Sequence, residues 1–292
     1  DCLLSRGLGD VYKRQLHMLP PDVAQDIANK TVDRGFLEEG FLSPMSTVLI
    51  NHLVPNNAEW FALCDRLNRL AQKIVNNAII DGKRDDPKPI SVRLMLKSNQ
   101  SLQGAVLLSQ RGMTAEAETL ARTCLEITFW LGYLAKKPEE AAALFMAEEH
   151  KSSSERAKML AKLMEPEAAA HFVKIAAEAD AAYAKGPNKI RIKELAERAN
   201  LADQYVYYRT LCAVSAHPSI SSLDRFIKVN EDGLLGFNVG PDEDGIPFAL
   251  MNTVNAHLWG LGFFAIVNDM DDTEEHLNGI RAERDRLLMA MV

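Results

Sequence analysis

The sequence predicts an all-α fold: a multi-helix bundle built on a long antiparallel helical hairpin, with one small β-hairpin insertion. Apolar residues recur at spacings of three and four over most of the chain, which is the period of an amphipathic helix. Prolines, glycines and short polar runs separate these stretches, at points where helices are expected to begin and end. The 292 residues are 47% hydrophobic, so a core of ordinary size is expected.

The first expected helices precede the long hairpin. Residues 20–36 begin with two prolines and an acid, which is typical of a helix start, and are expected to end near a glycine. Residues 56–82 place apolar side chains on one face, with Asn57 as the expected cap and Gly82 as the stop. The charged segment 82–89 is expected to link this part to the hairpin.

The long hairpin is predicted from residues 90–112 and 114–136. Both stretches have helical periodicity and are joined by very few residues. Gly112 suits a left-handed position after the first helix, and Thr114 is the expected N-cap of the second. So short a connection implies two antiparallel helices.

The remaining elements are helices, with one exception. The segment around residues 225–240 has two apolar runs flanking the turn sequence NEDG, which predicts a β-hairpin. The whole chain is expected to divide into residues 1–15, an N-terminal helical segment 16–85, and a helical bundle domain 86–292. The other helices are expected at residues 139–164, 166–183, 190–200, 202–217, 248–270 and 273–291.

The first fifteen residues, DCLLSRGLGDVYKRQ, have a different character. Their DVYKRQ resembles the translated mosaic end of a library-preparation transposase, and SRGLG resembles the adapter beside it. We therefore expect residues 1–15 to be adapter-derived and natural sequence to begin near Leu16, with any upstream targeting signal outside the sequence. A genuine N-terminal arm is the alternative.

The charge and composition of the chain argue against some classes of function. The net charge is −7, and it becomes −8 without the three basic and two acidic residues of positions 1–15. An acidic chain argues against broad, salt-driven nucleic-acid binding but leaves room for a local basic pocket. No uninterrupted apolar run reaches the roughly 18 residues of a spanning helix, so no membrane partner is expected. Three well-separated cysteines beyond position 15 indicate a reduced, cytoplasmic protein.

Residues 114–136 contain a conflict between apolar and charged positions. Their second half is uncharged, which predicts a central helix, yet Glu118, Arg122 and Glu126 follow one another at spacings of four. One interpretation is a solvated ion-pair ladder on the surface. The other is a part-buried polar cluster, because Glu126 has apolar neighbours and a buried acid needs partners. In the second case Arg122 and Glu126 would pair with the Tyr-rich helix, including Arg209 or His217.

That Tyr-rich helix, residues 202–217, supplies the second candidate cluster. Arg209 and His217 are eight positions apart, and long side chains at that spacing can converge on one ligand. Tyr205 and Tyr208 lie beside them and complete the expected cluster. The alternative is that His217 caps its own helix and the tyrosines fill an interface. The sequence has no metal-ligand motif, phosphate loop or dinucleotide fingerprint, so neither a metal nor a cofactor is expected.

Two segments carry a family resemblance. The segment GMTAEAETLARTCLEITFWLGYL, with its Arg-x-x-x-Glu pair, and YRTLCAVSAHPS, with Ser-x-His, resemble a bacterial helical family of unknown function. That family is in turn similar to the HEPN helical bundles, many of which are dimeric, metal-independent ribonucleases of toxins and phage defence. The HEPN motif has four to six residues between Arg and His, whereas seven separate Arg209 from His217.

Two function classes follow. The first is a non-enzymatic helical module that binds a small ligand or protein partner in a polar pocket. The second, which the resemblance implies, is a HEPN-like endoribonuclease. Because the first class is non-enzymatic and the second is an enzyme, the sequence leaves open whether the chain is an enzyme. In the second class RNA would be the substrate, and a homodimer would form the groove that binds it. Arg209 would bind the scissile phosphate, and His217 would act as general acid or base. The sequence identifies no other partner.

Overall fold

The computed structural model describes residues 34–291, except for 185, 188, 217 and 230–232. The predictions for residues 1–15, for most of the helix at 20–36 and for His217 therefore lie outside the described residues. The expected start of the natural chain near Leu16 is equally untested. Within the described range, residues 34–39 are helical, so Gly35 lies inside a helix and does not end it.

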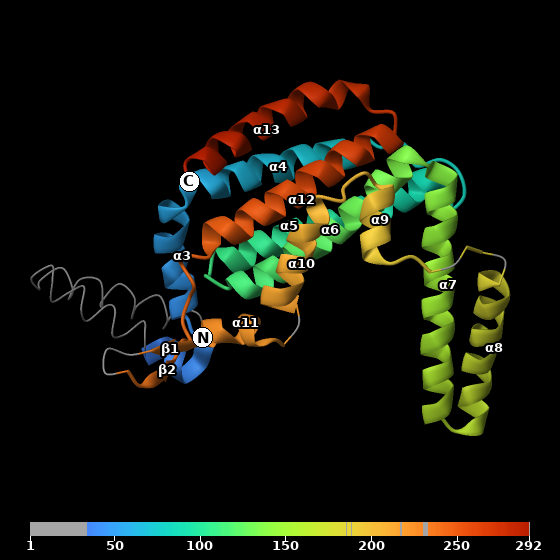
Figure 1. Cartoon of the computed structure of the whole chain (residues 1–292), viewed down its shortest axis with the longest axis horizontal. Helices are drawn as coiled ribbons and strands as arrows, with labels where there is room; N and C mark the ends of the chain where they lie inside the picture. The colour runs from blue at the N-terminus through green and yellow to red at the C-terminus, as the bar shows by residue number, and fades with distance from the viewer. Residues whose placement is uncertain (1–33, 185, 188, 217, 230–232, 292) are drawn as a thin grey trace, which may run out of the picture.

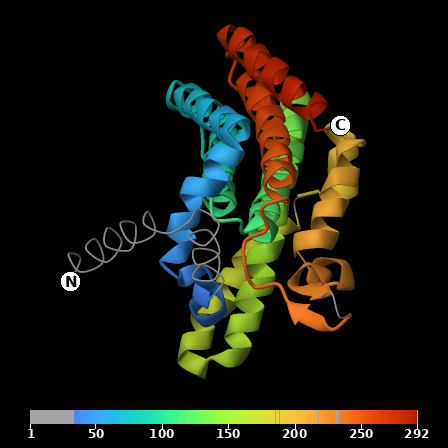
Figure 2. The same ribbon diagram turned by 90° about the vertical axis from the view of Figure 1, so that its left-hand side faces the viewer.

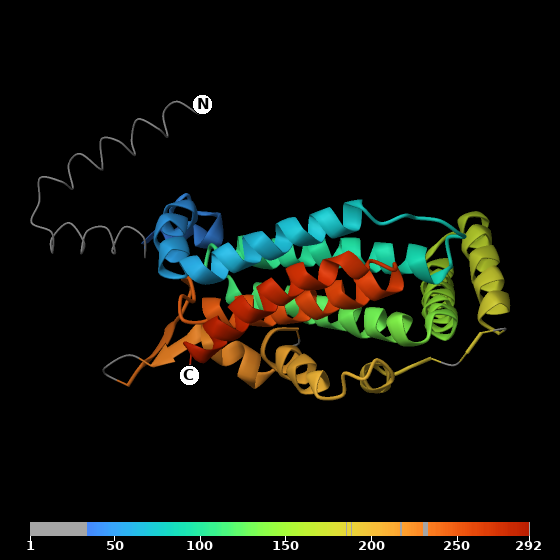
Figure 3. The same cartoon turned by 90° about the horizontal axis from the view of Figure 1, so that it is seen from above.

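The fold is an all-α bundle, as predicted. Five of its helices run side by side along the long axis of the molecule (Figures 1 and 3). Each presents an apolar face to a common core, which includes the fully buried Leu67, Leu102, Phe129 and Phe264. The five helices are α4 (Ala58–Asn76), α5 (Pro87–Ser109), α6 (Thr114–Lys136), α12 (Ile246–Val267) and α13 (Glu274–Met289).

Helix α12 is the central helix of the bundle. It is apolar on nearly every face because it packs against α4, α5, α6 and α13. By length and composition alone it could cross a membrane, but 61% of its apolar window is buried inside the fold, as in the core helix of a soluble protein. Gly260 allows α12 to approach α6 closely, since a Cβ there would lie 2.8 Å from the Thr128 hydroxyl.

Helices α5 and α6 form the predicted antiparallel hairpin. Gly112 has φ of +74°, the left-handed conformation expected of it. The prediction that Thr114 caps α6 is wrong: Thr114 is the first helical residue, and its hydroxyl donates to Asp242 Oδ2 at 2.5 Å. The Asp242 backbone N–H also donates to the Gly112 carbonyl at 3.0 Å. The hairpin turn is thus held by the segment that leads into α12.

Helices α7 (Pro138–Leu163) and α8 (Pro166–Tyr183) form an arm at one end of the bundle (Figures 1 and 3). Prolines at the first position of each helix explain where they begin. Helix α3 (Met45–Asn56) was not expected, because it carries little amphipathic pattern and contains Pro55 in its last turn. It precedes α4, which ends at Asn76, well before the stop expected at Gly82.

The chain then runs back along the bundle through short elements. Helices α9 (Ile192–Arg198) and α10 (Gln204–Leu211) lead into a π-helical turn, η2 (Cys212–Ala216). Helix α11 (Ile220–Leu223) and the 3₁₀ turn η3 (Asp224–Phe226) follow. The predicted β-hairpin is present: β1 (Ile227–Val229) pairs antiparallel with β2 (Leu235–Phe237).

Candidate functional site

The three charged residues of α6, Glu118, Arg122 and Glu126, belong to two separate ion pairs. Glu118 does not pair with Arg122; its Oε2 accepts from Nη2 of Arg225, in η3, at 3.3 Å. The Glu118 side chain is only 3% exposed, and that of Arg225 is 24% exposed. Burial raises the pKa of Glu118 above its ordinary value, although the Arg225 guanidinium opposes the shift. This pair joins the base of the β-hairpin to α6.

Arg122 and Glu126 form the second pair, which also includes a tyrosine of α10. The Nη1 atom of Arg122 lies 3.5 Å from Glu126 Oε2 and donates to the Tyr208 hydroxyl at 3.0 Å. The same guanidinium lies over the Tyr208 ring, 5.5 Å from its centre, and 4.0 Å from the Cys212 sulfur. The side chains of Arg122 and Glu126 are half-buried, so the solvated-ladder interpretation is wrong for this pair.

The Tyr-rich helix therefore meets α6 through Tyr208 and not through Arg209. The Tyr208 ring is buried and stacks on Tyr205, with ring centres 5.9 Å apart. Burial, with Glu126 as the next contribution, raises the pKa of Tyr208, so the hydroxyl stays protonated and can donate to Glu126 Oε2 at 3.4 Å. Arg209 is exposed, and its side chain makes no hydrogen bond or ion pair with any residue that the structure describes.

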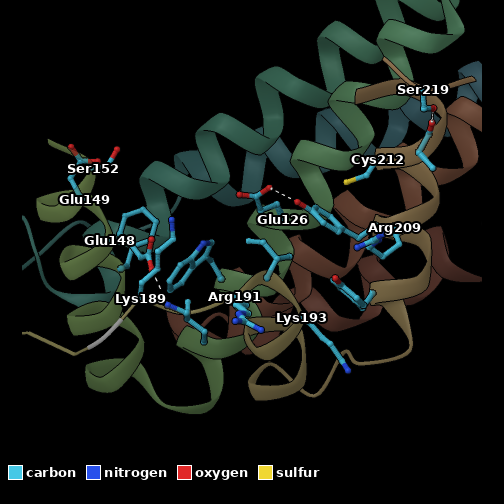
Figure 4. Close-up of a pocket in the computed structure, with 17 residues that line it drawn as sticks. Glu126, Glu148, Glu149, Ser152, Lys189, Arg191, Lys193, Arg209, Cys212 and Ser219 are labelled. Atoms are coloured by element: carbon cyan, nitrogen blue, oxygen red, sulfur yellow. Dashed lines mark hydrogen bonds between the residues drawn. The ribbon is translucent and has the colours of Figure 1, made fainter. Parts of the chain in front are cut away.

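This cluster forms the floor of a large groove between α6, α7, α9 and α10 (Figure 4). The groove has a volume of about 1170 Å³. Glu126, Tyr205, Tyr208 and Arg209 all line it, so the structure gathers four of the sequence-predicted residues at one site. Its other principal lining residues are Trp130, Phe145, Glu148, Glu149, Lys189, Arg191, Lys193 and Cys212.

Three of the groove cations form no ion pair within the described part of the chain. Lys189, Arg191 and Arg209 make no ion pair there, and Lys193 only approaches Glu197, at 3.9 Å. Three acids, Glu126, Glu148 and Glu149, also line the groove. Glu148 accepts from the backbone N–H of Ile190 at 2.9 Å, and Glu149 pairs with Arg156 at 3.0 Å. The lining therefore holds four cations, Lys189, Arg191, Lys193 and Arg209, against three carboxylates, in a chain of net charge −7.

The basic wall was missed by the sequence interpretation, although a signal for it existed. The segment Lys-Ile-Arg-Ile-Lys, residues 189–193, alternates basic and apolar residues. In the structure Ile190 is buried while Lys189, Arg191 and Lys193 are exposed. Residues 189–191 are not helical, and alternation there puts Lys189 and Arg191 on one side. Lys193 lies in the first turn of α9, within the short helix predicted at residues 190–200.

The described residues contain no group of three or more His, Cys, Asp or Glu side chains placed to hold a metal ion. Glu118 and Glu126, which a carboxylate metal site would need together, belong to separate pairs. What the site offers is hydrogen-bond donors, cations and aromatic faces. This combination suits recognition of an anionic group attached to a planar or apolar body.

Residues 89–234 match a protein family described as a family of unknown function, DUF5677. The chain belongs to this family. The matched residues make up half of the chain and include α6, the basic segment 189–193 and the Tyr-rich helix α10. No curated protein and no solved structure matches the chain.

Proposed function

We propose that this member of the DUF5677 family is a non-enzymatic helical module whose groove binds an anionic ligand with a planar or apolar part. The observation that carries the proposal is the set of three groove-lining cations, Lys189, Arg191 and Arg209, that form no ion pair with the described residues. Cations that lack an ion-pair partner and line one groove of an acidic protein favour an anion from solution.

The rest of the groove supports a ligand with more than a charge. Tyr205 and Tyr208 are stacked at its floor, and Trp130 packs edge-on against Phe145 at 5.1 Å in the wall. Aromatic faces beside cations favour a flat ring system over a small inorganic ion. Arg122 fixes the floor by holding Tyr208 in place, at 3.0 Å.

We place this module in a reducing compartment, the cytoplasm. The described cysteines, Cys64, Cys124 and Cys212, are all unpaired thiols. Burial raises the pKa of Cys64 and of Cys124 to about 12, so both stay protonated. Unpaired, unreactive thiols are typical of proteins that function under reducing conditions.

A fluorescence titration with 8-anilinonaphthalene-1-sulfonate, an anionic aromatic probe, tests the proposal. We expect saturable binding that weakens at least tenfold in Arg191→Gln/Arg209→Gln, because two charge-assisted contacts are lost. Lys162→Gln/Lys174→Gln removes the same charge from the α7–α8 arm and should bind like the wild type. Equal affinities of all three proteins would contradict an anion site in the groove.

An endoribonuclease of the HEPN type is the second candidate, and the π-helical turn η2 favours it. A π turn contains about one residue more than the α turn it replaces. The five residues of η2, Cys212–Ala216, therefore turn through about the same angle as four residues of an α-helix. This offsets the one residue by which the spacing of Arg209 and His217 in the sequence exceeds that of the HEPN motif. Arg209 would serve as the phosphate clamp, with its exposed guanidinium already in the groove.

RNA incubation separates the two candidates. A nuclease would cleave RNA in the presence of a chelator, and His217→Ala and Arg209→Ala would both abolish cleavage. Cleavage that falls on dilution of the protein would add support for a dimeric active site. Intact RNA with wild-type protein, together with retained binding of the aromatic sulfonate, would support the binding module alone.

A further inference from the structure

A second, smaller pocket lies on a different face of α10 from the groove. Tyr205 and Tyr208 of α10 line the groove, whereas Gln204, Tyr207 and Leu211 line this pocket, together with residues of α6, α12 and α13. In Figure 2, seen along the bundle, α10 is the gold helix beside α6 and α12. We call this the α12 pocket; its polar lining residues are Gln204, Tyr207, Asn252, Asn255, Trp259 and Arg284.

Asn252 offers a hydrogen-bond acceptor to the α12 pocket. The residue lies on α12 and is only 6% exposed. Its Nδ2 donates to the Phe248 carbonyl at 2.9 Å, but no described residue donates to its Oδ1. Unlike the amide atoms of Asn99, this oxygen is not fully enclosed, so a molecule in the pocket can reach it. An amide oxygen withdrawn from bulk water without a donor costs free energy, which an N–H group of a bound molecule would recover.

Arg284, on α13, offers a donor to the same pocket. Its side chain is 15% exposed, and Nε and Nη2 donate to Asp285 Oδ1 at 2.9 and 2.6 Å. Nη1 donates to no described residue and, unlike Nη1 of Arg225, is not fully enclosed. Because Asp285 already offsets the charge of this guanidinium, the remaining N–H groups favour a neutral carbonyl oxygen over an anion.

The rest of the lining favours a flat molecule with polar edges. Trp259 is 42% exposed and stacks on Phe263, with ring centres 6.1 Å apart. The side chains of Gln204 and Asn255 make no hydrogen bond with a described residue, so both can serve further polar atoms of a ligand. A flat ring with hydrogen-bonding edges would use both the aromatic face and these amides.

The size of the α12 pocket limits its ligand to about one ring. Its volume is about 210 Å³. This equals the volume of about seven water molecules at about 30 Å³ each, and it is below the roughly 300–1,000 Å³ of pockets that hold drug-sized ligands. The groove, at about 1170 Å³, is several times larger.

We propose that the α12 pocket is a second binding site, which takes a small, uncharged, planar amide such as an aromatic carboxamide. The N–H of the ligand donates to Asn252 Oδ1, its carbonyl accepts from Arg284, and its ring lies against Trp259. An amide carries this donor and this acceptor side by side, so one group satisfies both protein atoms. The site goes beyond the proposed function, since it takes an uncharged ligand at a different face of α10.

An NMR titration of the ¹⁵N-labelled full chain with nicotinamide, an uncharged aromatic carboxamide, tests this proposal. The chain has three tryptophans, so the indole N–H signals report on Trp259 in the α12 pocket, Trp130 in the groove and Trp60 elsewhere. Trp259→Phe assigns the signal of Trp259. We expect that signal to shift saturably, with a dissociation constant on the order of 1 mM, as for a ligand of this size. The signals of Trp130 and Trp60 should stay in place.

Two comparisons test the amide contacts. Methyl nicotinate keeps the ring and the carbonyl but lacks the N–H groups, so it should bind the wild type at least tenfold more weakly than nicotinamide. Asn252→Leu should weaken nicotinamide binding by a similar factor, because the acceptor is removed. Arg191→Gln/Arg209→Gln, which changes only the groove, should bind nicotinamide like the wild type.

Three results would overturn the proposal. The first is a Trp259 signal that does not move up to 10 mM nicotinamide. The second is equal binding of methyl nicotinate and nicotinamide, a comparison that needs no variant and holds even where Asn252→Leu does not fold. The third is a shift confined to Trp130, which would place the amide in the groove. The aromatic sulfonate titration is read from Arg191 and Arg209, so either proposal can fail without the other.

Discussion

The guanidinium of Arg122 lies 3.0 Å from the hydroxyl of Tyr208, and this contact joins α6 to the Tyr-rich helix α10. Glu126 completes the cluster, so one hydroxyl links a cation and a carboxylate that lie on the same helix. The contact holds the floor of the groove. The first prediction concerns what happens when it is removed.

Tyr208→Phe should lower the free energy of unfolding by about 1–2 kcal/mol, because a charge-assisted hydrogen bond is lost and the ring is retained. Tyr205→Phe is the matched control. The Tyr205 hydroxyl has no hydrogen bond with the described residues, so its removal should cost less than about 0.5 kcal/mol. Urea unfolding of both variants gives the comparison. Equal losses would mean that the Arg122–Tyr208 contact contributes nothing specific.

The two carboxylates of α6 should differ strongly in their contribution to stability. Glu118→Ala leaves Arg225 without its partner in a largely buried place and should cost about 3 kcal/mol. Glu126→Ala should cost about 1 kcal/mol or less, because its side chain is 36% exposed and water can replace it. Chemical denaturation at neutral pH measures both. A larger loss for Glu126→Ala would reverse this ranking of the two pairs.

His257 should make the fold sensitive to acid. Its ring is fully buried on α12, Nδ1 lies 2.9 Å from the Ser98 hydroxyl, and burial lowers the pKa to about 3. A depressed pKa means that the unfolded chain binds the proton more readily. Stability is therefore fully present above the unfolded pKa of about 6.5 and falls by up to about 1.4 kcal/mol per pH unit below it.

His257→Gln should remove this component of the pH dependence, whatever its effect at neutral pH. The measurement is the free energy of unfolding between pH 7 and pH 4 for both proteins. Subtracting one curve from the other cancels the carboxylates that the two chains share. Parallel curves would show that the pKa of His257 does not differ between the folded and unfolded states.

Gly112→Ala should destabilise the α5–α6 hairpin by about 2 kcal/mol. An alanine at position 112 would have to adopt the left-handed backbone conformation, which costs energy for any residue with a Cβ. Its Cβ would also overlap Pro241, in the segment before α12. Gly279→Ala, on α13 where a Cβ meets nothing within 4 Å, should instead stabilise by about 0.5–1 kcal/mol. Thermal unfolding compares the two. A Gly112→Ala protein as stable as the wild type would contradict the described turn.

The helices could be predicted where the apolar periodicity and the glycine or proline residues at the helix ends agree. Gly112 and the short join after it were enough to predict the α5–α6 hairpin, and the NEDG turn predicted the β-hairpin. Helix α3 was missed because Pro55 and a weak amphipathic pattern conceal it. Helix α12 runs from Ile246 to Val267, close to the helix predicted at residues 248–270.

For the site, the sequence could predict which residues share one helix, but only in part which residues of different helices meet. The spacing of Glu118, Arg122 and Glu126 was visible, but the partner of Glu118 is Arg225, 107 positions away, and no local pattern connects them. The contact between Arg122 and Tyr208, 86 positions apart, agrees with the prediction that α6 pairs with the Tyr-rich helix. The catalytic roles considered for Arg209 and His217 stay predictions.

A crystal structure of the protein with 8-anilinonaphthalene-1-sulfonate tests the central claim, an anion site in the groove, most directly. We predict the sulfonate within about 2.7–3.2 Å of the guanidinium of Arg191 or Arg209, with the ring system against Tyr205. A probe bound only outside the groove, with the groove empty, would contradict the claim.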